Sequence, residues 1–320
     1  MKFPLHRIRA AAAFGAFLLG MGAAWAADSL AGLEGAVHSP ALQQRLDRAV
    51  AATLARDWKP ALTTNQLAVT VVDLGRPEAP EFASYRGREV IYPASVIKLF
   101  YLAAAHRWMQ DGKIQDTPEL RRAMRDMIVE SYNEATHYVI DVLTDTTSGP
   151  ELSDSELKTW WERRNAVNRW IAGLGYPASV NASKKPWGEG PYGRETQAIR
   201  AFKPKSNQLT TEATARIVTE IALGRMVSRE RSRQMLELMS RDFTGPTKDP
   251  EDQAHGYSGI ALKPGMKLWS KCGLTSQTRH DAALVEMPDG HRWVIVTFTT
   301  GHSEDRNLIP SVVQGLLEGQ

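Results

Sequence analysis

A serine and a lysine three residues apart could serve as a nucleophile and its base. Ser95 and Lys98 have this spacing, which places two side chains on one face of a helix. A serine hydroxyl is a weak nucleophile until a base accepts its proton, and a buried amine beside other cations loses its own proton more easily. Since Ser95 opens the expected helix, free backbone N–H groups there would favour developing negative charge. The pair predicts an acyl-transfer site.

Two further motifs could complete such a site. An S-x-x-K sequence alone is weak evidence, because serine and lysine are common residues. The chain also has an S-x-N sequence at 131–133 and a K-x-G sequence at 271–273. Together they predict one cleft in which the Ser95 hydroxyl faces an amine, an amide side chain and a second ammonium carried by a strand.

Each motif has a competing match elsewhere in the chain, at 155–158, 179–181 and 263–265. The competing S-x-x-K lies in a charged stretch, whereas Ser95 follows a proline and opens an apolar segment. The competing S-x-N lies in a loop, and Pro264 would interrupt a strand ladder. We therefore interpret the competing matches as surface sequence.

The elements that must position these motifs follow from hydrophobic periodicity. Strands are predicted near the two ends of the chain, and helices fill the middle. We expect an α/β (α+β) sandwich in which an antiparallel five-stranded sheet is flanked by helices and carries an inserted all-helical subdomain. The sheet part covers about 41–93 and 266–320, and the helical part about 94–265. The strands are expected at 67–73, 81–85, 267–272, 282–287 and 292–299, and the helices at 42–58, 95–109, 119–129, 134–143, 155–174, 211–222, 229–239 and 309–317.

The N-terminus has the pattern of a cleavable secretory signal. Lys2, Arg7 and Arg9 form a basic head, and an apolar stretch over 10–25 ends in small residues before a predicted cut after Ala26. A retained membrane anchor is the alternative, but the stretch is short and glycine-rich. We expect a signal peptide at 1–26 and a periplasmic or secreted catalytic domain at 27–320, with no stable anchor after cleavage.

Composition narrows the function classes. The chain has 39 Lys+Arg and 36 Asp+Glu, and three of the basic residues lie in the predicted signal, so the remainder is balanced. Nothing in that balance favours nucleic acid as a partner. Cys272 is the only cysteine, so an internal disulfide is excluded. The eight histidines show no ligand spacing, and we expect neither a metal nor another cofactor. We expect a monomer.

With the three motifs in this order, the chain resembles a class A β-lactamase, within the serine β-lactamase and penicillin-binding superfamily. The resemblance covers about residues 42–317. It includes the Pro-x-x-S-x-x-K entry, the helix after the S-x-N motif, a segment at 207–211 similar to D-x-T-T, and a hairpin from 271 to 301 with a Pro-Asp-Gly turn. It implies the fold given above and hydrolysis through an acyl-enzyme.

The resemblance implies the catalytic roles residue by residue. Ser95 would be acylated, Lys98 would be its partner base, and Ser131 would relay a proton toward the leaving nitrogen. Backbone N–H groups of Ser95 and Leu274 would form the oxyanion hole, where one donor is typically worth about 3 kcal/mol of barrier.

It also implies a set of substrate-binding residues, with departures from the family pattern. Asn133 would hold the substrate amide, and Lys271, next to Gly273, would meet the substrate carboxylate. Tyr132 stands where the family has aspartate, and is interpreted as a pocket wall. Cys272 stands where the family has threonine or serine and is a weaker hydrogen-bond donor.

Two further family positions are less regular. The carboxylate-binding arginine position falls on His280, interpreted as a pocket-rim residue, with Arg279 adjacent. The loop that should carry a deacylating glutamate shows no E-x-x-L-N pattern. Glu189 is the first candidate for this general base and Glu195 the second.

The sequence therefore predicts an exported serine hydrolase that acts on a small-molecule β-lactam or a peptidoglycan peptide. The leading hypothesis is a β-lactamase. The alternatives are a DD-peptidase-like acyltransferase and a penicillin-binding sensor that acylates and stalls, and a glutaminase of the same fold is a distant fourth. A well-placed glutamate in the loop would favour the β-lactamase, and a loop without one would favour slow release.

Overall fold

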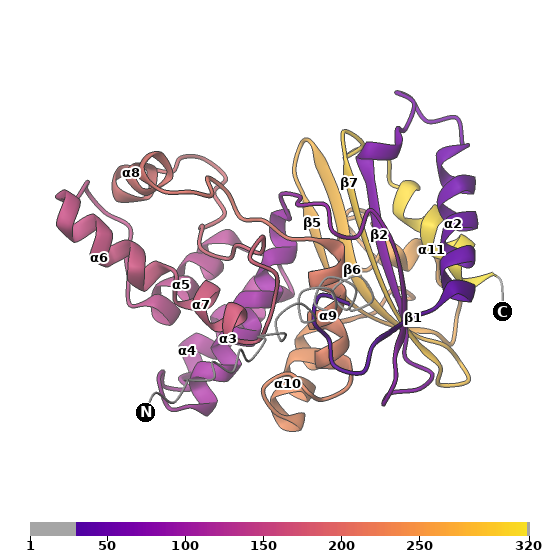
Figure 1. The fold of residues 1–320 in the computed structure, drawn as a ribbon, viewed down its shortest axis with the longest axis horizontal. Coiled ribbons are helices and arrows are strands. Elements are labelled where there is room, and N and C mark those ends of the chain that lie inside the picture. Colours follow the sequence, from indigo (N-terminus) through magenta and orange to yellow (C-terminus); the bar gives the residue numbers. More distant parts are fainter. Residues whose placement is uncertain (1–29, 319–320) are drawn as a thin grey trace, which may run out of the picture.

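The computed structural model describes residues 30–318, so the predicted signal peptide at 1–26 lies outside the described residues. Within that range, no helix has both the length and the apolar character needed to span a bilayer. The described residues form a sheet with helices on both of its faces and a helical part that lies to one side (Figure 1).

The sheet has seven strands in the order β1-β3-β2-β7-β6-β5-β4, so the prediction of five strands was wrong in number. The five long strands are antiparallel to their long neighbours, as expected. The two additional strands lie at the edges, and β1 runs parallel to β3. Two-residue strands carry no period that a sequence pattern could reveal. The strands are β1 (Val37–His38), β2 (Leu67–Asp73), β3 (Glu81–Tyr85), β4 (Ser240–Arg241), β5 (Lys267–Leu274), β6 (Thr278–Glu286) and β7 (Arg292–Thr300).

Helices cover the two faces of the sheet differently. The terminal helices α2 (Pro40–Leu54) and α11 (Leu308–Leu317) pack on each other and on one face. Helix α9 (Thr211–Ala222) contacts β2, β6 and β7 on the opposite face. Since apolar strand residues alternate between the faces, each face has its own buried cluster.

The helical part is built around α3 (Lys98–Gln110), which is buried along almost its whole length. A short 3-10 turn, η2 (Ala94–Ile97), leads into it. The expected helix at 155–174 is two helices that meet at Asn165, and the expected loop from 176 to 205 contains a helix. The other helices of this part are α4 (Pro118–Ile128), α5 (Asn133–Thr144), α6 (Asp154–Arg164), α7 (Ala166–Gly173), α8 (Gly193–Ala201) and α10 (Arg229–Met239), and the remaining 3-10 turns are η1 (Thr64–Gln66) and η3 (Ser258–Ala261).

Candidate active site

Ser95 lies at the junction of the sheet and the helical part. It belongs to η2, and the backbone N–H of Lys98 donates to its carbonyl oxygen, so the two residues are one helical turn apart. The Ser95 side chain is half-buried, which leaves it open to a substrate. Ala94 before it has φ +46°, a left-handed conformation that is costly for alanine. The serine therefore sits on a constrained turn at the mouth of a buried helix.

Strand β5 passes directly beside this turn. A Cβ atom built at Gly273 would lie 3.2 Å from the Ser95 backbone nitrogen and 2.7 Å from the Pro93 carbonyl oxygen. Only glycine allows this approach. The next residue, Leu274, is 43 % exposed. The Ser95 N–H and the end of β5 are thus close neighbours, as an oxyanion hole made of Ser95 and Leu274 would require.

Lys98 is fully buried and bonds across to the S-x-N segment. Its Nζ atom donates to the Ser131 carbonyl oxygen at 2.5 Å and to Asn133 Oδ1 at 2.9 Å, and lies 3.3 Å from Ser131 Oγ. Burial, reinforced by the positive charge of Lys271, lowers the pKa of Lys98 to about 6. A large share of this amine is therefore neutral at pH 7 and able to accept a proton.

Ser131 links two ammonium groups. Its hydroxyl accepts from Lys271 Nζ at 2.9 Å and faces Lys98 Nζ on its other side. Ser131 has φ +60°, so the backbone holds this serine in a conformation that non-glycine residues rarely adopt. Tyr132 caps α5, and Asn133 is its first residue. The structure brings Ser131 and Asn133 together with both predicted lysines.

Lys271 is also fully buried, on β5. Burial, together with the charge of Arg241, lowers its pKa to about 8, which leaves it mostly protonated at neutral pH. Its Nζ atom donates to Ser131 Oγ, to the Cys272 carbonyl oxygen at 2.9 Å and to Gln253 Oε1 at 3.0 Å. A charged lysine at this position can attract an anionic substrate group.

Gln253 is a site residue that sequence reasoning missed. Its Oε1 atom accepts from Lys271 Nζ and, at 3.1 Å, from the Cys272 backbone N–H. Its Nε2 atom donates to the carbonyl oxygens of Ile128 and Val129 at 2.8 and 2.7 Å. One buried amide thus ties the end of α4 to β5 across the site. It lies in a polar loop, and no motif distinguishes it there.

Tyr132 and Cys272 occupy contrasting positions. Tyr132 is 56 % exposed beside Asn133, as a pocket wall would be. Cys272 is buried, and its side chain belongs to the apolar cluster under α2 and α11. Because successive side chains of a strand point to opposite faces, Cys272 turns away from the face that carries Lys271.

Arg279 and His280 are both buried rather than open to the site. Arg279 donates to the carbonyl oxygens of Ser303 and Gly256 and pairs with Glu251. His280 is bound between the Tyr92 carbonyl oxygen at 2.9 Å and the Thr299 N–H at 3.1 Å, and burial lowers its pKa to about 4. The expected rim position of His280 is therefore wrong. Both side chains are committed to contacts inside the fold.

The two candidate glutamates differ sharply in environment. Glu189 is exposed on the loop before α8, and no contact recorded between residues 30 and 318 joins it to Ser95 or Lys98. Glu195 is buried on α8. Its carboxylate accepts from Arg164 at 2.9 and 3.0 Å and from the Ser148 hydroxyl at 2.9 Å.

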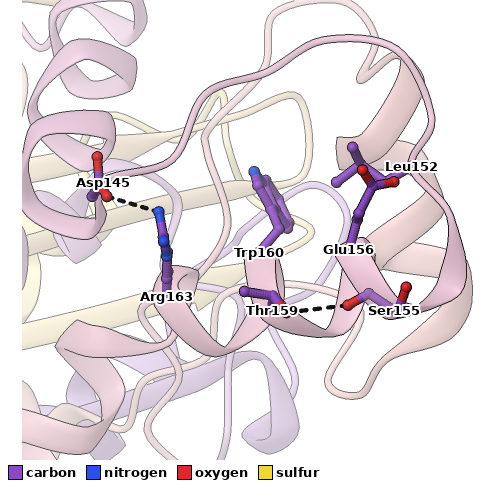
Figure 2. Close-up of a pocket in the computed structure, with 7 residues that line it drawn as sticks. All are labelled: Asp145, Leu152, Ser155, Glu156, Thr159, Trp160 and Arg163. Atoms are coloured by element: carbon purple, nitrogen blue, oxygen red, sulfur yellow. Dashed lines mark hydrogen bonds and ion pairs between the residues drawn. The ribbon is translucent and has the colours of Figure 1, made fainter.

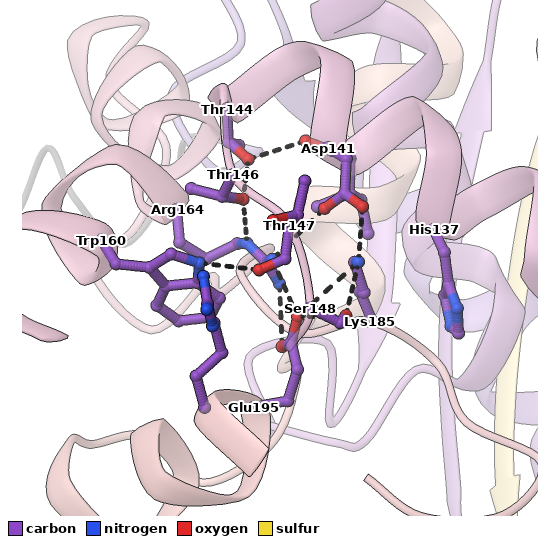
Figure 3. A network of polar contacts seen from close by, with 12 residues as sticks. His137, Asp141, Thr144, Thr146, Thr147, Ser148, Trp160, Arg164, Lys185 and Glu195 are labelled. Atoms are coloured by element: carbon purple, nitrogen blue, oxygen red, sulfur yellow. Dashed lines mark hydrogen bonds and ion pairs between the residues drawn. The ribbon is translucent and has the colours of Figure 1, made fainter. Parts of the chain in front are cut away.

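Glu195 is part of an ion network that also contains Asp141 and Lys185 (Figure 3). Lys185 Nζ donates to Asp141 Oδ2 at 2.8 Å and lies 3.6 Å from Glu195. Burial raises the pKa of Asp141, which Lys185 and Arg164 oppose. The network joins α5, α6, α8 and the loop before α8, so it fixes the segment that carries both glutamates.

The competing serine of the second S-x-x-K sequence lies elsewhere. Ser155 lines an open pocket of about 380 Å³ on α6, together with Asp145, Trp160 and Arg163 (Figure 2). Lys158 is exposed. No ammonium is recorded beside the Ser155 hydroxyl in the described part of the chain, and its recorded partner is the Ser153 hydroxyl at 3.4 Å. The structure thus separates the two S-x-x-K sequences, and Ser95 alone meets the other motifs.

The model of the beta-lactamase enzyme family matches residues 115–318. The fold is similar to solved structures over most of both chains. A beta-lactamase from Sphaerobacter thermophilus has a TM-score of 0.61 at 20 % identity, covering 86 % of this chain and 96 % of the other. PBP-A has a TM-score of 0.58 at 17 % identity, covering 89 % and 98 %.

A point mutant of PBP-A, solved as an acyl-enzyme complex with penicillin G, has a TM-score of 0.57 at 17 % identity and covers 88 % of this chain and 96 % of the other. No curated protein matches the sequence. At these identities the structural similarities establish the fold.

Proposed function

Because the chain belongs to the beta-lactamase enzyme family, we propose that it is a serine hydrolase in which a β-lactam or a peptidoglycan peptide acylates Ser95. The observation that carries this proposal is the geometry around Lys98. A fully buried amine with a pKa lowered to about 6 lies one turn from an accessible serine and bonds to both polar residues of the S-x-N motif.

Acylation proceeds in steps that these residues can support. The neutral Lys98 amine accepts the Ser95 hydroxyl proton, and Ser95 Oγ attacks the carbonyl carbon of the substrate amide. The oxyanion receives hydrogen bonds from the backbone N–H groups of Ser95 and Leu274. The carbon–nitrogen bond then breaks, and Ser131 delivers the proton to the leaving nitrogen. Lys98 restores the Ser131 proton, which returns the amine to its neutral form.

Charge at the site favours anionic substrates. Lys98 and Lys271 are buried without a carboxylate partner among the hydrogen bonds and ion pairs of the described residues. A substrate carboxylate would supply the missing negative charge opposite Lys271. Both β-lactams and peptidoglycan peptides carry such a group, and Asn133 would hold the substrate amide beside it.

Slow release of the acyl group is the second part of the proposal. Hydrolysis of the acyl-enzyme needs a base for water, and Glu195 is neutralised by Arg164 while Glu189 is exposed. We therefore favour a penicillin-binding or DD-peptidase-like acyltransferase over a rapid β-lactamase. The acyl-enzyme form of the PBP-A mutant, a protein of the same fold, supports this choice. Export to the periplasm or the medium remains part of the proposal.

The test is intact mass spectrometry of the purified protein during incubation with a chromogenic cephalosporin. We expect a covalent adduct that persists after the free compound is removed, and none in Ser95→Ala. Rapid colour development with only a transient adduct would instead establish a β-lactamase. Absence of an adduct in the wild type, or the same adduct in Ser95→Ala, would remove acylation at Ser95 altogether.

A further inference from the structure

A second cavity lies behind the helix that carries Lys98. It has a volume of about 310 Å³ and is enclosed by α3, α4 and α10. Its floor includes His106, Met109 and Met124, all less than 10 % exposed, and Leu238 closes one side. The size lies at the lower end of the range for small-molecule sites.

His106 is the polar group on this floor. Its side chain is buried, with 3 % exposure, and neither ring nitrogen has a hydrogen-bond partner among the described residues. Burial, with a contribution from the Arg231 charge and opposed by Asp116, lowers the pKa of His106 to about 4. The imidazole is therefore neutral at pH 7 and presents one donor and one acceptor. Leaving both unused inside a protein is unfavourable, so the ring is suited to a partner in the cavity.

The other walls define what that partner can be. Met109 and Met124 contribute flexible thioether side chains, which make favourable contacts with the edges of aromatic rings. The rim charges are already paired, because Asp116 bonds to Arg121 at 2.6 Å and lies 3.6 Å from Arg231. A neutral ligand with an aromatic body thus fits the cavity better than an ion.

We propose that this cavity binds a small neutral aromatic alcohol of the phenol class. Its hydroxyl, both a donor and an acceptor, bonds to the His106 imidazole, and its ring contacts Met109 and Met124. His106 follows Lys98 by eight residues, about 12 Å along α3. The cavity is therefore separate from the candidate active site, and this inference does not depend on the proposed acylation.

The test is an NMR titration of the purified protein with phenol, following the ring signals of His106. We expect saturable shifts, and binding of phenol at least fivefold tighter than binding of benzene, which lacks the hydroxyl. His106→Phe removes the hydrogen bond while keeping a ring of similar size, and should abolish the preference for phenol. Absence of saturable shifts would show that only water meets the imidazole and would overturn the proposal.

A cavity-filling variant provides an independent check. Leu238→Trp leaves His106 intact and should weaken phenol binding at least tenfold by occupying the space. Its thermal unfolding midpoint and circular dichroism spectrum verify the fold. Equal binding of phenol and benzene to the wild type, or unchanged phenol binding in Leu238→Trp, would contradict the proposal even if His106→Phe did not fold.

Discussion

Two groups of buried cations in this molecule have opposite surroundings. Lys98 and Lys271 bond to hydroxyl, amide and carbonyl oxygens, and no carboxylate accepts from either of them in the described structure. Arg164 and Lys185 are buried as deeply but pair with Glu195 and Asp141 (Figure 3). Both groups belong to or border the helical part, so depth of burial alone does not distinguish them.

The difference shows how partners determine what a buried cation does. A cation without an anionic partner resists its own charge, and the pKa of Lys98 falls until the amine can act as a base. A cation that shares its space with carboxylates stays charged and holds segments of chain together. We therefore interpret the first group as chemical and the second as structural, and each prediction below tests that division.

The largest expected effect is the loss of the unpaired amine. Lys98→Ala should lower the rate of Ser95 acylation at least 1,000-fold, which corresponds to about 4 kcal/mol of barrier, because no other base accepts the hydroxyl proton. Quenched mass spectrometry with a chromogenic cephalosporin measures it. The matched control is Lys158→Ala, in the competing S-x-x-K sequence, which should acylate as the wild type does. Retained acylation in Lys98→Ala would point to a different base.

The next effect should appear in stability. Glu195→Gln leaves the Arg164 guanidinium buried without its main carboxylate, and should lower the free energy of unfolding by about 3 to 5 kcal/mol in urea titrations. The control is Asp145→Asn, which removes an exposed pair with Arg163 at 2.8 Å and should cost at most about 1 kcal/mol. Equal losses in the two variants would show that the network is no more than a surface feature.

A substitution can also convert one environment toward the other. Gln253→Glu places a carboxylate against Lys271, so the lysine should gain the kind of partner that Lys185 has. We expect the pKa of Lys271 to rise and acylation by an anionic β-lactam to slow about tenfold to a hundredfold, as its carboxylate meets a neutralised ammonium. Rates measured across pH 7 to 10 should show the descending limb move to higher pH. Gln253→Leu should slow acylation without that shift.

The smallest effect is the pH dependence of the wild type. Lys98 must be neutral to act as the base, and its pKa is lowered to about 6, so acylation should be about tenfold slower at pH 5 than at its plateau near pH 7. Above about pH 8 the rate should fall again, as Lys271 loses its proton. Acylation rates between pH 4.5 and 9 provide the test, and a flat profile would argue against an amine base.

The sequence predicted most of the architecture and the main polar groups of the site. The family resemblance is confirmed by the family match, and the five long strands lie close to their expected ranges. Ser131, Asn133 and Lys271 meet Lys98 because motifs with local spacing leave a strong pattern.

What sequence reasoning missed depends on contacts between distant segments. Gln253 is one glutamine in a polar loop, and its role emerges only when the loop folds between α4 and β5. Glu195 and Glu189 look alike in sequence, and only the position of Arg164 separates them. His280 was expected at the pocket rim because its strand borders the site, but β6 lies inside the sheet rather than at its edge.

The short strand β4 has a consequence for how copies of this protein meet one another. It pairs only with Leu268 and Trp269 of β5, which could leave a long row of peptide groups ready to recruit a strand from a neighbouring molecule. Side chains occupy that row instead, since Arg241 donates to the Ser270 carbonyl oxygen at 2.8 Å and Gln253 accepts from the Cys272 N–H. The sheet is thus protected against edge-to-edge aggregation beside a cleft that must stay open.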